Sequence, residues 1–153
     1  MKRRTFLKGT VASGMLGVAA SAGLLAPRMV LAAWPKAAFE AKSIDGGLDA
    51  LYGTASHTES GDIKIKAPDI AENGAVVPIT VSTGMAAESI SVLIAENPVP
   101  VACSYALGAS TLGFVSTRVK MGKTSDLIAV VKSGGKLHSA KKTVKVTIGG
   151  CGG

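Results

Sequence analysis

Cysteine, histidine and tryptophan are scarce in this sequence. Its 153 residues include two cysteines, two histidines and one tryptophan. Small exported domains that depend on disulfides carry more cysteines than this, so a disulfide framework is excluded. The fold must therefore be stabilised by packing, and at least one of the two thiols is free for other chemistry.

The residues that hold metals and common cofactors are missing in the arrangements that those groups need. The sequence contains no Cys-x-x-Cys pair, no haem-attaching Cys-x-x-Cys-His and no phosphate-binding glycine loop. A blue-copper site needs histidines beside its cysteine, but the first histidine after Cys103 is the distant His138. We therefore expect no metal and no bound cofactor. The other histidine, His57, is expected at the surface.

The first 33 residues have the pattern of a twin-arginine signal peptide. Arg3 and Arg4 precede a Phe-Leu-Lys sequence, a glycine- and alanine-rich apolar run over residues 9–26 and a small-residue site at 30–33. The run is too rich in glycine for a typical membrane anchor, and it ends in a cleavage-like site. We therefore predict export of the folded protein to the periplasm, without stable membrane anchoring.

The high net charge of the chain comes mostly from this leader. The whole sequence carries +7, whereas the part after residue 33 has 12 basic and 10 acidic residues. This balance gives no reason to expect nucleic-acid binding. The charges are unevenly distributed, because the part from Arg118 onward has eight basic residues and one acid, Asp126. Such asymmetry is typical of a steering surface, and equally of a solvated face.

The chain changes from helical to strand-like periodicity near residue 60. Residues 34–60 are predicted to hold a helical segment over 35–52, which the glycines Gly46 and Gly47 are expected to divide. Residues 61–148 show about seven short runs with alternating apolar residues, separated by turns. This pattern predicts an all-β domain, an antiparallel β-sandwich of immunoglobulin-like type. The Cys…Trp…Cys signature of antibody domains is absent, since the single tryptophan, Trp34, precedes the strands.

Cys103 is expected to be a small apolar core residue. It alternates with Val99, Val101, Tyr105 and Leu107, which places all five on one predicted face. A disulfide between Cys103 and the second cysteine would require Cys103 to leave that core.

The second cysteine, Cys151, is flanked by glycine pairs, Gly149-Gly150 and Gly152-Gly153. Glycine adds flexibility and no bulk, so residues 149–153 are predicted to form a thin, flexible arm. Its stretch from residue 148 to the thiol spans roughly 10 Å when extended. A thiol on such an arm suits a covalent carrier that enters deep pockets.

Three other readings of the arm remain open. Cys151 could pair with Cys103, or it could link two copies of a structural periplasmic subunit through a disulfide. It could also serve a thiol-redox enzyme with His138 as its base. No basic group lies beside Cys151 in the sequence to lower its pKa, which favours a passive carrier over an enzyme.

Several segments together resemble one protein family. They are the glycine-flanked Cys151, the strand 143–148, the segment 116–120, the stretch Glu96-Asn97-Pro98 and the twin-arginine leader. The resemblance is to SoxY, the sulfur-carrier subunit of the periplasmic thiosulfate-oxidising Sox system. It implies an immunoglobulin-like sandwich with no catalytic activity of its own.

The resemblance also implies partners and a role for the arm. Members of this family form a heterodimer with a SoxZ-like subunit that is exported with them. A SoxAX-like cytochrome would couple thiosulfate to Cys151, and a SoxB-like manganese hydrolase would release sulfate. A SoxCD-like enzyme would oxidise the remaining sulfur in some organisms. The glycines around Cys151 would let the arm enter each partner, and Lys141, Lys142 and Lys145 could steer docking.

Overall fold

The computed structural model describes residues 35–147. The predicted signal peptide with Arg3 and Arg4, and the predicted arm at 149–153, lie outside these residues. The described elements are α2 (Lys36–Glu40), α3 (Ile44–Tyr52), β1 (Thr58–Glu59), β2 (Ile63–Lys66), β3 (Ile70–Ala71), β4 (Val77–Thr83), β5 (Ser89–Ile94), β6 (Val101–Ala106), β7 (Phe114–Val119), β8 (Ser125–Ser133) and β9 (Lys136–Val146).

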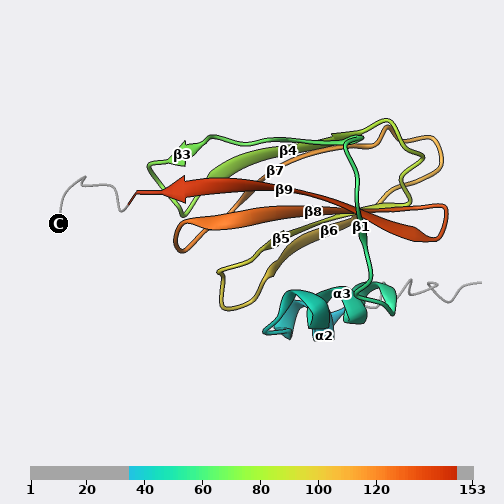
Figure 1. The fold of residues 1–153 in the computed structure, drawn as a ribbon, viewed down its shortest axis with the longest axis horizontal. Coiled ribbons are helices and arrows are strands. Elements are labelled where there is room, and N and C mark those ends of the chain that lie inside the picture. Colours follow the sequence, from blue (N-terminus) through green and yellow to red (C-terminus); the bar gives the residue numbers. More distant parts are fainter. Residues whose placement is uncertain (1–34, 148–153) are drawn as a thin grey trace, which may run out of the picture. The chain divides into compact units, whose positions relative to one another are not determined.

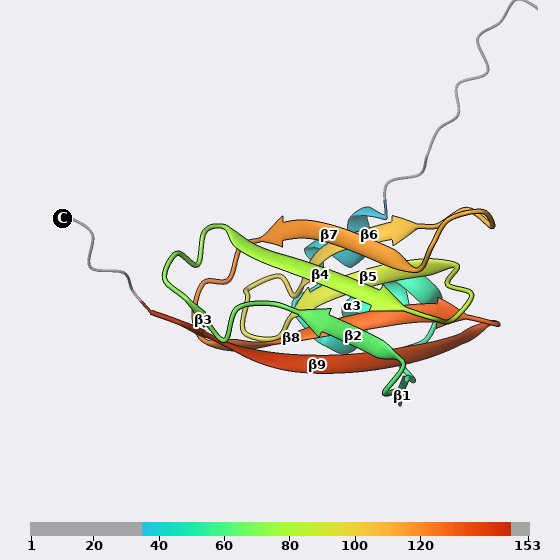
Figure 2. The same ribbon diagram turned by 90° about the horizontal axis from the view of Figure 1, so that it is seen from above.

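The strands form two sheets that pack face to face (Figures 1 and 2). The larger sheet has the order β1-β9-β8-β5-β6, with β3 also paired to β9, and the smaller one has the order β2-β4-β7. All pairings are antiparallel except those of the two-residue strands β1 and β3, which run parallel to β9. The predicted immunoglobulin-like sandwich is confirmed.

Alternating side chains build the core between the sheets. In β4, Val77, Ile79 and Val81 are buried, whereas Pro78 is exposed. Facing them from the larger sheet are buried apolar side chains of β5, β8 and β9, among them Val92. Burial of each such side chain stabilises the fold by about 1.5–3 kcal/mol.

The two helices cover the outer face of the larger sheet (Figure 1). Leu48 of α3 is fully buried against Leu93 and Val130 of the sheet. The hydroxyl of Tyr52, at the end of α3, shares a 2.6 Å hydrogen bond with the buried Ser91 of β5. This bond fixes the end of the helix on the sheet.

The helical segment is divided, but not at the glycines. The break covers residues 41–43, and Gly46 and Gly47 lie inside α3. Ser43 begins α3 instead, because its backbone is extended and its Oγ accepts a 3.1 Å hydrogen bond from the amide of Gly46. Such N-caps satisfy the free amides of a first helical turn. The expected break at Gly46–Gly47 was therefore wrong.

The expected common face of Val101 and Cys103 was also wrong. Val92 pairs with Cys103 and Leu93 with Val101, so the register between β5 and β6 shifts by one residue. Such a bulge turns the side chains on either side of it to opposite faces. Val101 consequently packs against the helices, while Cys103 packs against the core between the sheets.

Candidate functional site

The described residues include the point from which the predicted carrier arm leaves the sandwich. Cys151 and its flanking glycines lie beyond the described residues, but β9 leads directly toward them and ends at Val146. The amide of Val146 donates a 3.0 Å hydrogen bond to Oγ1 of Thr124. On the other side, the amide of Thr147 donates a 3.1 Å hydrogen bond to the carbonyl of Ala71. We call Val146 and Thr147 the root of the arm, and hydrogen bonds hold this root from both sides.

Close backbone packing supports this root. The amide of Met121 donates a 2.7 Å hydrogen bond to the carbonyl of Gly74. A Cβ at Gly74 would stand 2.3 Å from the Met121 carbonyl and 2.8 Å from a methyl of Val146. Only glycine permits this approach, and it locks the 67–76 connection against the end of β9.

Two further loops at this end are joined by Asn97. Its Nδ2 donates to the carbonyl of Lys120 at 2.8 Å, and its Oδ1 accepts from the amide of Gly122 at 3.1 Å. Lys123 and Glu96 add an exposed ion pair of 3.1 Å. Asn97 belongs to the Glu96-Asn97-Pro98 stretch singled out in the sequence, but its bridging role required the structure.

The position of the root shows whether His138 could act as a base for the thiol of Cys151. His138 precedes Thr147 by nine residues on the continuous strand β9, a separation of roughly 30 Å. The four residues from Thr147 to Cys151 span at most roughly 14 Å. His138 is therefore out of reach of the thiol, and the pairing with Cys151 is excluded while β9 stays folded.

The Cys103–Cys151 disulfide fails on similar grounds. Across the sheet, Cys103 lies in register with Ala140 of β9, and β5 and β8 separate the two residues. Ala140 lies seven residues before Thr147, so the offsets across and along the strands together place Cys103 roughly 27 Å from Thr147. A disulfide needs its two Cα atoms within about 7 Å of each other, which the arm cannot provide.

Cys103 itself has an unreactive environment. It is a free, half-buried thiol on β6. Burial raises the pKa of the Cys103 thiol, and hydrogen bonds with Tyr105 and the Val92 backbone only partly oppose that rise. The thiolate is the reactive form, so this cysteine is suited to packing and not to chemistry.

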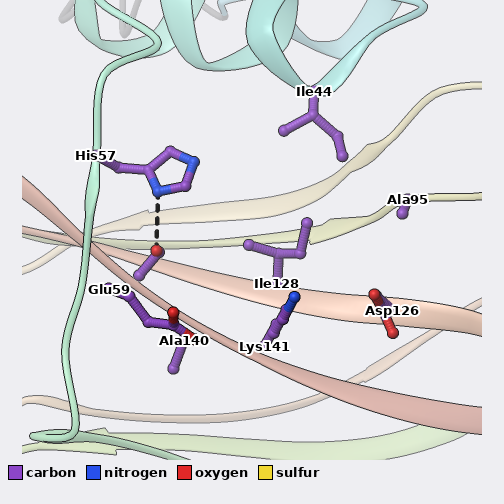
Figure 3. A pocket seen from close by; sticks show the side chains of 9 residues that line it. Ile44, His57, Glu59, Ala95, Asp126, Ile128, Ala140 and Lys141 are labelled. Carbon is purple, nitrogen blue, oxygen red and sulfur yellow. Dashed lines mark hydrogen bonds between the residues drawn. The ribbon is translucent and has the colours of Figure 1, made fainter.

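A cavity of about 440 Å³ lies on the outer face of the larger sheet (Figure 3). At one end His57 Nδ1 and Ser139 Oγ share a 2.8 Å hydrogen bond, and the exposed His57 confirms the surface position expected for it. Two acids, Glu59 and Asp126, and one cation, Lys141, also line the cavity, so it holds charges of both signs. Ser139 lies eight residues before Thr147, so the His57 end is also beyond the reach of Cys151.

The lysines of β9 do not form a single patch. Lys141 and Lys145 are exposed, whereas Lys142 alternates with them and points to the opposite face. There its ammonium donates to the carbonyl of Ala67 at 2.7 Å and pairs with Asp69 at 3.0 Å. Lys142 is thus a structural contact and is not free to steer a partner.

Residues 35–147 contain neither a cluster of metal-binding side chains nor a membrane-spanning helix. No three acidic, histidine or cysteine side chains in that range are grouped closely enough to hold a metal ion. No helix of the same range is long and apolar enough to span a membrane.

Comparisons with known proteins agree with one another. Residues 48–151 match the family described as "Sulfur oxidation protein SoxY". The structure of the sulfur carrier protein SoxY from Chlorobium limicola f thiosulfatophilum is similar, with 43% sequence identity and a TM-score of 0.63. The match covers 69% of this chain and 97% of that one. Among curated proteins, none matches.

Proposed function

Because the chain belongs to the SoxY family of sulfur oxidation proteins, we propose that it carries sulfur covalently on the thiol of Cys151. The observation that carries this proposal is the family match itself, which spans residues 48–151 and so extends to this cysteine. The chain acts as a substrate-bearing subunit, and partner enzymes perform the chemistry.

The structure of the arm's root supports this role. A carrier must present its cargo in a constant direction, and the hydrogen bonds of Val146 and Thr147 fix the point of departure. Beyond that point the glycines at 149, 150, 152 and 153 supply a narrow profile. Neither histidine of the chain comes within reach of the thiol, which fits a thiol that is activated inside a partner.

The proposed cycle has two steps on Cys151. In the first, thiosulfate and the thiol lose two electrons and one proton together, and a new S–S bond joins them as a cysteine S-thiosulfonate. The two electrons would leave one at a time through the haem of a SoxAX-like cytochrome to a further electron acceptor. In the second, water attacks the terminal sulfonate sulfur within a SoxB-like manganese hydrolase, which releases sulfate and leaves a persulfide on Cys151.

The proposal includes the other partners and the compartment. The chain would form a heterodimer with a SoxZ-like subunit, and in some organisms a SoxCD-like enzyme would oxidise the persulfide sulfur. The twin arginines Arg3 and Arg4 would direct export of the folded protein to the periplasm. Export in the folded state would let a SoxZ-like partner that lacks a signal peptide of its own cross the membrane together with this subunit.

Intact mass spectrometry of the mature protein from thiosulfate-grown cells tests the function. We expect adducts with the mass of sulfur or thiosulfate that a reductant removes and that are absent from the Cys151→Ala variant. Cys103→Ala is the matched control and should retain the adducts.

Two outcomes would contradict the carrier. A mass lower by two hydrogens, with no adduct, would indicate a Cys103–Cys151 disulfide. A population that consists only of disulfide-linked dimers, even with thiosulfate present, would instead favour a structural subunit joined through Cys151.

A further inference from the structure

The exposed face of the smaller sheet carries a group of positive charges. We call it the basic face and define it by four exposed cations: Lys64 and Lys66 on β2, Arg118 on β7, and Lys120 just after β7. No acidic residue occurs in β2, β4 or β7. The three strands of this face therefore carry charge of one sign, and the nearest acid along β2 is the exposed Asp62, just before the strand.

These cations are also unpaired within the described part of the chain. The ion pairs found there employ Lys36, Lys123, Lys132 and Lys142. Each of those lysines meets an acid, whereas none of the four cations of the basic face lies within 4 Å of one. Exposed like charges on one face repel each other, so such a face is costly unless a partner neutralises it.

The charges have a regular arrangement on the sheet. Lys64 and Lys66 point outward from β2 on one side of the sheet. Arg118 near the end of β7 and Lys120 just after that strand lie on the other side. The central strand β4 separates the two columns by roughly 10 Å. Between them, Val76 is 50% exposed and precedes the exposed Pro78. A neutral strip with a charged rim is the usual composition of a protein interface.

The basic face adjoins the root of the arm. Lys120 immediately precedes Met121, whose amide is hydrogen-bonded to Gly74. Gly74 in turn packs within contact distance of Val146, at the end of β9. A protein that binds this face thus holds its own surface beside the point where the arm leaves.

We propose that the basic face docks an acidic surface on the enzyme that receives the arm. The inference rests on the proposed function and specifies how the carrier is recognised. Carboxylates next to the entrance of that enzyme's pocket would engage the two cation columns, align the arm and accelerate encounter by electrostatic steering. A lipid surface fits less well, because Thr80 and Ser82 occupy half of the neutral strip, and the exposed Phe114 lies at the start of β7, at the opposite end of that strand from Arg118.

The test compares two charge-reversal triples of equal net charge. The face variant carries Lys64→Glu, Lys66→Glu and Arg118→Glu. The control carries Lys36→Glu, Lys42→Glu and Lys136→Glu, three exposed positions elsewhere.

Binding is measured without chemistry. Heterodimers with the SoxZ-like subunit are prepared in the Cys151→Ala background, and their affinity for the purified SoxAX-like cytochrome is determined by calorimetry across a salt series. We expect the face triple to raise Kd at least about tenfold at low salt and to flatten the salt dependence. The control should shift Kd by less than about twofold at the same salt.

Three results would overturn the inference. These are equal effects of the two triples, loss of the SoxZ-like subunit from the face triple alone, and binding of the wild type to anionic phospholipid vesicles that the face triple abolishes. The second would identify the face as the subunit interface, and the third as a membrane surface. Failure of the carrier function is separate, because it appears as absent mass adducts while this binding assay remains interpretable.

Discussion

The backbone amide of Val146 donates a 3.0 Å hydrogen bond to the side-chain oxygen of Thr124. Val146 is the last residue of β9, and Thr124 immediately precedes β8, the neighbouring strand. The bond extends the contact between these strands by one step beyond their backbone pairing, which ends with Ser125 and Val144. A side chain thus closes the sheet at the place where the predicted arm begins.

Replacement of Thr124 by valine tests this closure. Thr124→Val keeps the shape of the side chain but removes the acceptor, so the free energy of unfolding should fall by about 0.5–1.5 kcal/mol. Amide hydrogen exchange at Val146 should become faster while exchange in the middle of β9 stays unchanged. Thr58→Val, at an exposed position with no side-chain hydrogen bond described, is the control. Unaltered exchange at Val146 in the Thr124 variant would show that the bond does not hold the root.

Gly47 is predicted to be required for packing of α3 on the sheet. A Cβ at this position would stand 2.5 Å from a methyl of Val101, so Gly47→Ala must displace the helix or Val101. Such overpacking should lower the free energy of unfolding by about 1–3 kcal/mol in urea denaturation.

A double-mutant cycle separates this clash from helix propensity. In a Val101→Ala background the obstructing methyl is absent, and the same Gly47→Ala change should cost little or even stabilise the helix. An equal cost of Gly47→Ala in both backgrounds would refute the role assigned to the contact.

The sandwich could be predicted because several of its strands, β4 among them, alternate between buried and more exposed residues. Val77, Ile79 and Val81 are apolar at every second position, and a half-buried strand needs no other information. The turn between β8 and β9 contains Gly134 and Gly135, and both have positive φ, at 56° and 74°, which favours glycine.

The predictions from the sequence were wrong where tertiary contacts, and not the local pattern of apolar residues, determine the structure. Gly46 and Gly47 read as a helix break, but close approach to Val101 is the reason for glycine at 47. The common face expected for Val101 and Cys103 ignored a bulge, which leaves no trace in an alternating sequence. The parallel pairings of β1 and β3 involve two residues each, too few to show any periodicity.

In the candidate site too, some residues could be recognised from the sequence, whereas the role of others became visible only in the structure. Cys151 was evident from its glycine neighbours, because no core element has that composition. Thr124 and Asn97, which hold the root and its loops, are ordinary polar residues in turns, and only their partners across the fold give them a role. The basic face likewise required the sheet register, since Lys64 and Arg118 are far apart in the sequence.

Replacement of the twin arginines tests the predicted route of export. Arg3→Lys with Arg4→Lys keeps the charge but removes the paired guanidinium groups that distinguish this signal. We expect precursor to accumulate in the cytoplasm and the mature protein to disappear from the periplasm, as measured by fractionation and immunoblotting. Lys2→Arg with Lys8→Arg, outside the pair, should export normally. Undiminished export of the double lysine variant would exclude the twin-arginine route.

The two cysteines are predicted to differ in reactivity. Burial raises the pKa of the Cys103 thiol, so at neutral pH it holds less thiolate than an ordinary cysteine. Iodoacetamide should therefore modify Cys151 at least about tenfold faster than Cys103, as followed by peptide mass spectrometry. In the Cys151→Ala variant the slow phase alone should remain. Comparable rates at the two positions would contradict the environment described for Cys103.

The same raised pKa predicts a pH dependence of stability. Below the ordinary thiol pKa of about 8.5, Cys103 is protonated in both the folded and unfolded states, and its full contribution is present. As the pH rises above that value, the unfolded chain releases the proton first, so the free energy of unfolding decreases until the folded thiol also ionises. Urea denaturation at a series of alkaline pH values should show a shallower decrease for Cys103→Ala than for the wild type. Identical slopes in the two proteins would mean that the Cys103 thiol ionises equally well folded and unfolded.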